Sequence, residues 1–324
     1  TRPVFDYTVI FDRVQNILDD VRQNGDKALI NYTKQFDNAN LESLEVTKEE
    51  IAEAAPLLSV ELKQAIEMSR RNIWKFHSEQ QHDYDEIQTS PGVYCWQKAV
   101  PIEKVGFYIP GGSAPLFSTV LMLGIPAQIA ECKEVILCTP PNAEGKVHPA
   151  ILYAAKVAGI HRIFKVGGAQ AIAAMAYGTE TVPKVYKIFG PGNQYVTAAK
   201  QLVSLREVAI DMPAGPSEVE VIADETANPV FVAADLLSQA EHGADSQVLL
   251  VTTSEKLVEQ VKDQLLIQLN KLPRKEIAEK ALENSKIIIV KSLEEAIVFT
   301  NEYAPEHLII STKSYMVVSE NIVN

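Results

Sequence analysis

Length, composition and charge exclude several classes of protein before any motif is considered. The chain has 324 residues, of which 47% are hydrophobic and 22% charged, and this balance is ordinary for a globular protein that buries a large core and divides into two domains. The formal net charge of -12 argues against a nucleic-acid-binding surface, because phosphate groups are bound by clustered lysine and arginine side chains.

Cysteine content and hydropathy indicate a cytoplasmic protein without a membrane partner. The three cysteines, Cys95, Cys132 and Cys138, are odd in number and show no CxxC spacing, which suits a reducing compartment. No apolar run reaches membrane-spanning length, and the first residues have no signal-peptide pattern. Because the chain begins without Met and ends soon after an apolar segment typical of a strand, we expect it to be a fragment at both ends.

The first third of the chain is expected to be helical and solvated. Apolar residues at helical spacing predict a helix over residues 8–36, broken at Gly25. Thr47 with Glu50 three residues later forms a capping box that starts a second helix, and residues 60–78 make a third. We find no convincing catalytic group in this part of the sequence.

Strands and helices alternate through the rest of the chain. After two strands near residues 92–100 and 104–109, a first run of strands covers residues 134–138, 162–166, 184–189 and 207–211, and a second run covers residues 218–222, 248–252, 286–290 and 307–311. Most of these strands are separated by predicted helices, and such alternation predicts parallel sheets covered on both faces. We therefore expect an α/β protein with two units and a break near Pro216.

The helix that follows Asn228 carries a distinctive polar stripe. Asn228 is a good N-cap and Gly243 a good stop. Asp235, Gln239 and His242 are spaced three and four residues apart and so share one helix face. An imidazole and an amide oxygen directed at one point could hold a metal ion, whereas a solvated helix edge is the alternative interpretation.

Three glycine-rich turns follow strands, where open α/β sheets bind ligands. They lie at residues 110–112, 167–170 and 190–193, and backbone N–H groups in such turns can bind an anionic pyrophosphate. The dinucleotide fingerprint GxGxxG is absent, because the segment that starts at Gly190 has Tyr195 where the third glycine would stand. Tight turns without a ligand therefore remain an equal alternative.

Glu306 and His307 form an adjacent pair where the last helix meets the last strand. A carboxylate beside an imidazole supplies two groups that can move protons near neutral pH, although a strand start without any function is the alternative. A catalytic thiol, by contrast, needs an exposed activating site, and Cys138 has no histidine near it in the sequence. We do not expect thiol catalysis.

Six segments stand out together, in order along the chain. They are VGFYIPGG at 105–112, VGGAQAIA at 166–173, FGPGN at 189–193, DMPAGPSE at 211–218, LSQAEHG at 237–243 and NEYAPEH at 301–307. Together they resemble the histidinol dehydrogenase family, and six matches in order are far more specific than one motif. The resemblance implies a cytoplasmic enzyme that oxidises L-histidinol to L-histidine through the aldehyde, with two NAD⁺ and two successive hydride transfers, as the last step of histidine biosynthesis.

The resemblance also implies roles for individual residues. Glu306 and His307 match the acid/base pair, in which the glutamate activates the water that hydrates the aldehyde and the histidine accepts protons as the hydrides leave. Gln239 and His242 match zinc ligands. The NAD-contacting positions are matched by Tyr108, Gln170 and Asn193. The positions that contact histidinol are matched by Ser217, Gln239, His242 and His307.

The family's fold and assembly give further expectations. Two incomplete Rossmann-like domains with parallel sheets and an aldehyde-dehydrogenase-like architecture are implied. Residues 1–107 and 219–324 would form a discontinuous domain on the substrate and zinc side, and residues 108–218 the NAD-binding domain. Members are homodimers with one zinc per subunit, and an aspartate and a histidine beyond position 324 complete that site. With two zinc ligands of its own, the chain is expected to bind zinc weakly.

Two other functions stay open. One is a non-catalytic module that keeps two lobes and binds ligands without chemistry, and the other is a cysteine-dependent aldehyde dehydrogenase. Ligand affinity without NADH production would favour the first alternative. Loss of activity after alkylation of the thiols would favour the second.

Overall fold

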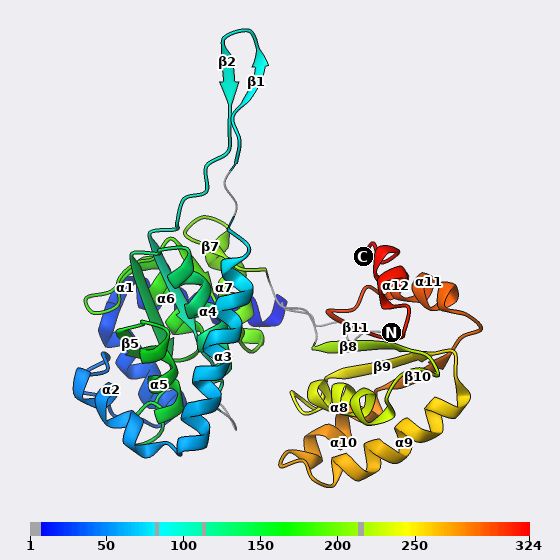
Figure 1. Cartoon of the computed structure of the whole chain (residues 1–324). Helices are drawn as coiled ribbons and strands as arrows, with labels where there is room; N and C mark the ends of the chain where they lie inside the picture. Colours follow the sequence, from blue (N-terminus) through cyan, green and yellow to red (C-terminus); the bar gives the residue numbers. More distant parts are fainter. Residues whose placement is uncertain (1–7, 82–83, 112–114, 213–216) are drawn as a thin grey trace. The chain divides into compact units, whose positions relative to one another are not determined.

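The computed structural model describes residues 8–81, 84–111, 115–212 and 217–324. The chain forms two compact units, an N-terminal unit within Phe5–Pro213 and a C-terminal unit within Ala214–Asn324 (Figure 1). Each contains a parallel sheet, so the expected α/β class with two Rossmann-like sheets is confirmed. The expected break at Pro216 lies outside the described residues, as does Gly112 of the first glycine-rich turn.

Five parallel strands form the sheet of the N-terminal unit. Their order is β5-β4-β3-β6-β7, made by Arg162–Lys165, Glu134–Thr139, Lys104–Tyr108, Lys187–Phe189 and Ala209–Ile210. β3 and β4 consist largely of buried apolar residues because helices cover both faces of the sheet. Since all five strands run in the same direction, their carboxyl ends lie together at one edge.

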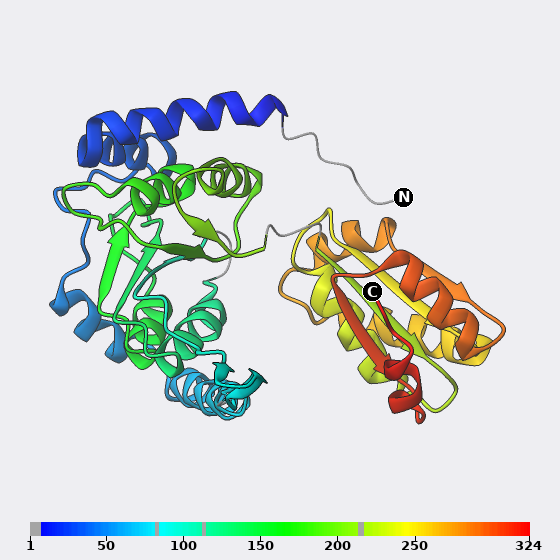
Figure 2. The same ribbon diagram turned by 90° about the horizontal axis from the view of Figure 1, so that it is seen from above.

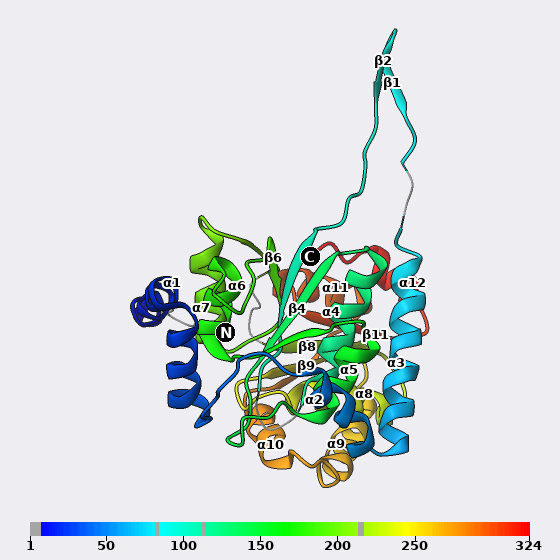
Figure 3. The same cartoon turned by 90° about the vertical axis from the view of Figure 1, so that its left-hand side faces the viewer.

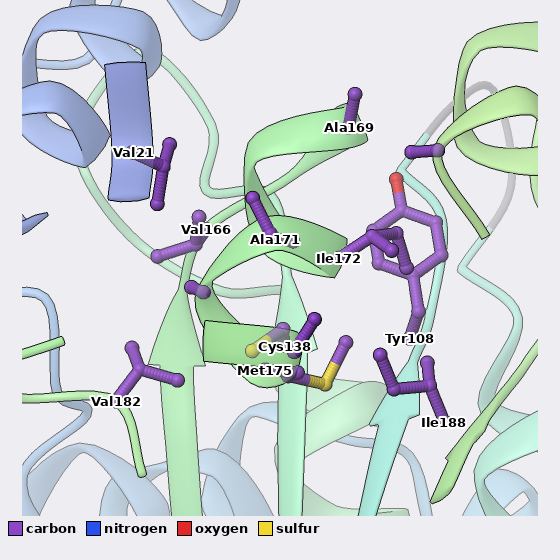
Figure 4. Close-up of a cluster of buried hydrophobic side chains, with 14 of the residues drawn as sticks. Val21, Tyr108, Cys138, Val166, Ala169, Ala171, Ile172, Met175, Val182 and Ile188 are labelled. Atoms are coloured by element: carbon purple, nitrogen blue, oxygen red, sulfur yellow. The ribbon is translucent and has the colours of Figure 1, made fainter. Parts of the chain in front are cut away.

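One face of this sheet is covered by α1 (Thr8–Asp37), α6 (Gly168–Tyr177) and α7 (Gln194–Ser204). Seen from above, the dark-blue α1 runs alongside α6 and α7 (Figure 2). Val21, Ile172 and Met175 from these helices belong to the same buried core as Cys138 of β4 (Figure 4). α1 bends at Gly25, whose φ of 50° is not helical, so the break expected there is confirmed.

The opposite face is covered by four helices that build a second core. They are α2 (Lys48–Ala54), α3 (Val60–Ser78), α4 (Phe117–Ile129) and α5 (Pro149–Val157), with a short 3₁₀ helix at Ala55–Leu57 after α2. Figure 3 shows α3, α4 and α5 on one side of the sheet and α1, α6 and α7 on the other. The capping box expected at Thr47 is present, with the Thr47 side chain accepting from the Glu50 N–H and the Glu50 carboxylate accepting from the Thr47 N–H.

A two-stranded ribbon projects from the N-terminal unit between α3 and β3 (Figures 1 and 3). Its strands, β1 (Ile87–Ser90) and β2 (Val93–Cys95), pair antiparallel, and every residue over 84–103 is exposed. The strand expected near residues 92–100 is therefore confirmed only at β2. No helix in the described part of the chain is long and apolar enough to cross a membrane.

Four parallel strands form the sheet of the C-terminal unit. Their order is β10-β9-β8-β11, made by Lys286–Ile289, Gln247–Thr252, Glu218–Ala223 and His307–Ser311. One core joins the sheet to α8 (Pro229–Ala240), α9 (Glu255–Leu269) and α10 (Lys275–Glu283). A smaller core on the other face lies under α11 (Leu293–Tyr303) and α12 (Tyr315–Glu320). α10 and α12 had no counterpart among the expected elements.

The compact units differ from the expected division of the chain. Residues before 108 were grouped with the C-terminal sheet, but α1 packs on α6 and α7, and α3 packs on α4. The expected boundary at 107/108 also falls inside β3, the central strand of the N-terminal sheet. The helices of the first third therefore belong, by their apolar contacts, to the same unit as the segment that was expected to bind NAD.

Candidate functional site

A large cavity of about 1190 Å³ opens at the carboxyl edge of the N-terminal sheet. Its wall contains the end of β3, the loop after β4, and the first turns of α5, α6 and α7. Residues from α1 and α2 complete the wall. Three residues expected to contact NAD, Tyr108, Gln170 and Asn193, all line this one cavity, although they come from three separate elements.

Tyr108 is a buried polar residue in the wall of the large cavity, with 3% of its surface exposed. Its hydroxyl accepts a hydrogen bond from the Gly168 backbone N–H at 3.1 Å. Burial raises the pKa of the phenol to about 12, so Tyr108 stays neutral at physiological pH. A neutral phenol held in this way can donate its own proton to a ligand oxygen.

Gln170 and Asn193 lie at the starts of α6 and α7. Gln170 is 1% exposed. Asn193 is the N-cap of α7, and its side-chain oxygen accepts from the N–H groups of Tyr195 and Val196 at 3.0 and 3.1 Å. Two helix N-termini therefore point their positive dipole ends towards one cavity, which favours the phosphates of a dinucleotide.

The turn that carries Gly190 is held against β3 by a buried ion pair. Lys200 donates to the Gly190 carbonyl oxygen at 2.8 Å and pairs with the Asp211 carboxylate, which in turn accepts from the Gly190 N–H at 2.8 Å. Gly190 has a φ of 129°, and a Cβ there would lie 2.0 Å from the carbonyl oxygen of Tyr108. Only glycine allows this close approach of two backbones.

Residues of α1 and α2 in the wall were not expected at a ligand site. Arg13 and Asp37 come from α1, and Glu50 and Glu53 from α2. Asp37 is the last residue of α1; its Oδ2 is buried and has no hydrogen-bond partner in the described part of the chain. Burial raises the pKa of this carboxyl to about 6. No local motif marks these residues, because long-range packing alone brings them to the carboxyl edge.

Glu306 and His307 lie where β11 begins, at the amino edge of the C-terminal sheet. A Glu306 carboxylate oxygen accepts from the Glu218 N–H at 3.2 Å, and the other lies 3.9 Å from Nε2 of His307. The side chains of Glu306 and His307 are 36% and 60% exposed. Ala304, which ends α11 in a left-handed conformation with φ 48°, turns the chain into this edge.

Gln239 and His242 reach the same edge from the end of α8. In a parallel sheet the connecting helices return to the amino ends of the strands, and β9 begins soon after α8 ends. The Ser217 carbonyl oxygen accepts from the Gln247 N–H at 3.1 Å, so Ser217 lies there as well. We refer to Ser217, Gln239, His242, Glu306 and His307 as the amino edge.

The polar stripe of Asp235, Gln239 and His242 was expected on one helix face, but His242 does not belong to the helix. α8 ends at Ala240, so His242 lies in the turn beyond the helix, and its N–H donates to the Gln239 carbonyl oxygen at 3.1 Å. Gly243 does not adopt a left-handed φ and so does not form the expected glycine stop. Gln239 is 8% exposed, whereas His242 is exposed.

A metal ion finds few ligands at the amino edge. Gln239 and His242 offer one amide oxygen and one imidazole, and among the residues that the structure describes no group of three His, Cys, Asp or Glu could hold a metal ion. Asp235 is partly buried, which raises the pKa of its carboxyl. Because zinc in proteins normally has at least three protein ligands, these two residues alone do not make a zinc site.

The three thiols lack the features of a nucleophile. Cys138 is fully buried and Cys132 partly so, and burial raises the pKa of both thiols. Cys95 is exposed on the projecting ribbon. Since the thiolate is the reactive form, the buried cysteines are chemically quiet, and the prediction against thiol catalysis is supported.

The fold belongs to the aldehyde-dehydrogenase-like class of α/β folds. It is similar to that of an apo betaine aldehyde dehydrogenase from Staphylococcus aureus, with a TM-score of 0.52 over 98% of this chain and 74% of that chain, at 10% identity. A likeness at this low identity shows the aldehyde-dehydrogenase-like fold alone, as expected.

Sequence and structure comparisons together define the family within that class. The family model of histidinol dehydrogenase matches residues 1–324, so the chain belongs to the histidinol dehydrogenase family and is an oxidoreductase. Histidinol dehydrogenases of Bacteroides thetaiotaomicron and Bacteroides fragilis are 64% and 66% identical over 323 residues, which cover 100% of this chain and 76% of each relative. The crystal structure of the histidinol dehydrogenase from Elizabethkingia anophelis matches with a TM-score of 0.97 at 56% identity, over 100% of this chain and 75% of that chain.

Proposed function

We propose that this chain is a cytoplasmic, NAD-dependent enzyme that oxidises L-histidinol to L-histidine through L-histidinaldehyde. Two relatives that share about two thirds of its residues are named histidinol dehydrogenases, which supports the substrate. The observation that carries the cofactor is the large cavity, because Tyr108, Gln170 and Asn193 line it together.

NAD⁺ would bind in the large cavity of the N-terminal unit. The first turns of α6 and α7 would receive the pyrophosphate, since their backbone N–H groups and dipoles favour a negative charge. Tyr108 and Gln170 are buried polar side chains whose hydrogen-bonding groups gain a partner when the cofactor enters. A volume of about 1190 Å³ is sufficient for a ligand of this size.

The reaction needs two hydride transfers separated by one hydration. In the first transfer the carbinol C–H bond breaks and its hydride passes to NAD⁺, while the hydroxyl proton passes to His307, which leaves the aldehyde. Glu306 then takes a proton from water as the water oxygen bonds to the aldehyde carbon, and His307 returns its proton to the carbonyl oxygen, which gives the hydrate. In the second transfer the hydrate gives its hydride to a second NAD⁺ and a hydroxyl proton to His307, which leaves the carboxylic acid. Both residues release their protons to solvent, to which they are exposed.

Histidinol would be bound at the amino edge by Ser217, Gln239, His242 and His307. This set combines two imidazoles, an amide and a hydroxyl, which suit an amine, an imidazole and an alcohol as hydrogen-bonding partners. For zinc we propose weak binding by this chain through Gln239 and His242, because no group of three His, Cys, Asp or Glu among the described residues could hold a metal ion. No step above depends on the metal.

We also propose that the chain forms a homodimer. Ile87, Tyr94, Trp96 and Val100, on the projecting ribbon and the chain that follows it, each expose between 55% and 69% of their surface. A two-stranded ribbon is marginally stable by itself in water, so a second copy that covers it would stabilise both. Light scattering on the purified chain would give a dimer mass, and Trp96→Ser with Val100→Ser would shift it towards the monomer. A monomeric parent chain would contradict the proposal.

The first experiment combines metal analysis with turnover. The purified chain is assayed for bound zinc and for NADH formation from L-histidinol and NAD⁺, with and without added zinc. We expect two NADH per histidinol consumed and less than one zinc retained per chain. Absence of NADH formation with zinc in excess would contradict the proposed activity. Turnover with one tightly held zinc per chain would contradict the weak zinc binding and leave the activity intact.

NADH binding without turnover would favour the alternative of a non-catalytic binding module. Direct titration of NADH against the chain separates this outcome from loss of the cofactor site. Because the large cavity lies within one unit, we expect NADH binding to be independent of zinc.

A further inference from the structure

Asp37 is the one group in the wall of the large cavity whose buried oxygen has no partner in the described part of the chain. Its Oδ2 is shielded from solvent, yet neither a hydrogen bond nor an ion pair reaches it. A buried carboxylate oxygen without a partner costs free energy, and proteins keep such groups where a ligand satisfies them. The position at the end of α1 holds the carboxyl rigidly, because α1 is anchored along α6 and α7.

The surroundings of Asp37 decide which ligand group fits. Its carboxyl lies near Tyr108, and the negative charge of Asp37 contributes to the raised pKa of the Tyr108 phenol. The other charged or titratable side chains of the wall are Arg13, Glu50, Glu53, Lys146, His148 and Tyr195. Glu50 is already paired with Lys165 at 2.7 Å and accepts from the Thr47 N–H, so it is not available as an acceptor in the same way.

A carboxylate acceptor beside a dinucleotide discriminates between two cofactors. The hydroxyl groups of a ribose diol are hydrogen-bond donors and satisfy the carboxylate, and acidic residues have this role in other dinucleotide sites. A 2′-phosphate has no comparable donor and would bring about two negative charges next to a buried carboxylate that no cation neutralises.

We propose that Asp37 accepts hydrogen bonds from a ribose of the bound cofactor and excludes a 2′-phosphate, so that this chain uses NAD rather than NADP. The proposal rests on the large cavity being the NAD site. Asp37 then belongs to the binding site although it lies in the helical first third of the chain. Arg13 lines the same cavity but is exposed, so its guanidinium is free to turn into solvent.

The test is a fluorescence titration of the purified chain with NADH and with NADPH. The unsubstituted chain is expected to bind NADH at least about tenfold more tightly than NADPH, which corresponds to about 1.4 kcal/mol. Asp37→Asn should weaken NADH binding about tenfold and reduce the ratio of NADH affinity to NADPH affinity by a similar factor. If the Asp37→Asn variant does not fold, Asp37→Ser is measured instead, and the same changes in the NADH and NADPH affinities are expected.

Glu49→Gln is the matched control, because Glu49 is an exposed carboxylate on α2 that does not line the cavity, and the variant loses the same charge. It should change both affinities by less than about twofold. Equal effects of Asp37→Asn and Glu49→Gln, or no effect of Asp37→Asn, would overturn the role of Asp37, while NADH binding by the unsubstituted chain would uphold the cofactor site. Tighter NADPH than NADH binding in the unsubstituted chain would also overturn it and point to Arg13 as a phosphate ligand. Binding of neither cofactor would overturn both this proposal and the NAD site.

Discussion

The large cavity and the amino edge are built on the same kind of sheet but present their functional groups in different ways. In the cavity, Tyr108 and Gln170 are buried, and burial raises the pKa of Tyr108 and of Asp37. At the amino edge, the side chains of Glu306 and His307 are 36% and 60% exposed, and the Glu306 carboxylate accepts a hydrogen bond from the Glu218 N–H.

The difference indicates which of these two regions is preformed. The cavity wall is held by core packing and by hydrogen bonds such as that from Gly168 to Tyr108, so its geometry exists before a ligand binds. The amino edge has exposed groups whose electrostatic effect is screened by water, and such groups become effective only when solvent is excluded. We therefore expect cofactor binding to tolerate little change in the cavity, and chemistry to depend on single residues at the edge.

The largest effect is expected at the amino edge from Glu306→Gln. The amide can still accept from the Glu218 N–H, so the fold is preserved, but the proposed base for the activation of water is lost. NADH formation from L-histidinaldehyde should fall about 10³-fold, measured with zinc supplied, while NADH affinity is unchanged. Glu302→Gln, an exposed carboxylate on α11, is the control and should keep full activity. If Glu306→Gln lowered the rate of NADH formation less than about tenfold, the proposed catalytic role of Glu306 would be contradicted.

The second prediction concerns the backbone that shapes the large cavity. In Gly190→Ala a Cβ would lie against the Tyr108 carbonyl oxygen, and the backbone φ of residue 190 is positive. We therefore expect the free energy of unfolding to fall by about 3 kcal/mol and NADH binding to weaken by a similar free energy. Gly92→Ala is the matched control, since φ is 82° there and no atom lies within 4 Å. Urea unfolding of the core should be unaffected by Gly92→Ala. Equal unfolding curves for the two variants would contradict the close approach at Gly190.

A smaller effect is expected on the stability of the chain without cofactor when Asp37 is replaced. The pKa of this carboxyl rises from 3.8 to about 6 on folding. Protonation of Asp37 therefore stabilises the folded state fully below pH 3.8, and this stabilisation is lost as pH rises through about 6. Asp37→Asn should therefore stabilise the cofactor-free chain by about 1 kcal/mol at pH 8, with most of the gain gone at pH 4. Paired thermal melts at the two pH values measure it. A variant that is less stable than the parent at pH 8 would show that the carboxylate has a structural partner.

The smallest effect is expected from the thiols. Iodoacetamide should reach the exposed Cys95, while the buried Cys138 stays unmodified because burial keeps it protonated. NADH formation should stay within about twofold of the untreated chain, since no step uses a thiol. Loss of turnover in proportion to the modification of one cysteine would restore the cysteine-dependent alternative.

Sequence patterns were most informative where the physics is local. The capping box at Thr47 and Glu50 and the break at Gly25 follow from hydrogen bonds or backbone freedom within a few residues, and the structure has both. The end of α8 was misjudged, because Gly243 was given the role of a stop although the helix ends at Ala240. Helix ends depend on the tertiary position of the next strand as well as on the capping residue.

The sequence by itself determined the family, the alternation of strands and helices, and the residues that end strands in glycine-rich turns. Only the tertiary structure decided that α1 to α3 pack on the N-terminal sheet and that Asp37 reaches the cavity of Tyr108, Gln170 and Asn193. The physical reason is range. Spacing records contacts within one helix or strand, whereas the choice of sheet on which an amphipathic helix packs depends on apolar surfaces far apart in the chain.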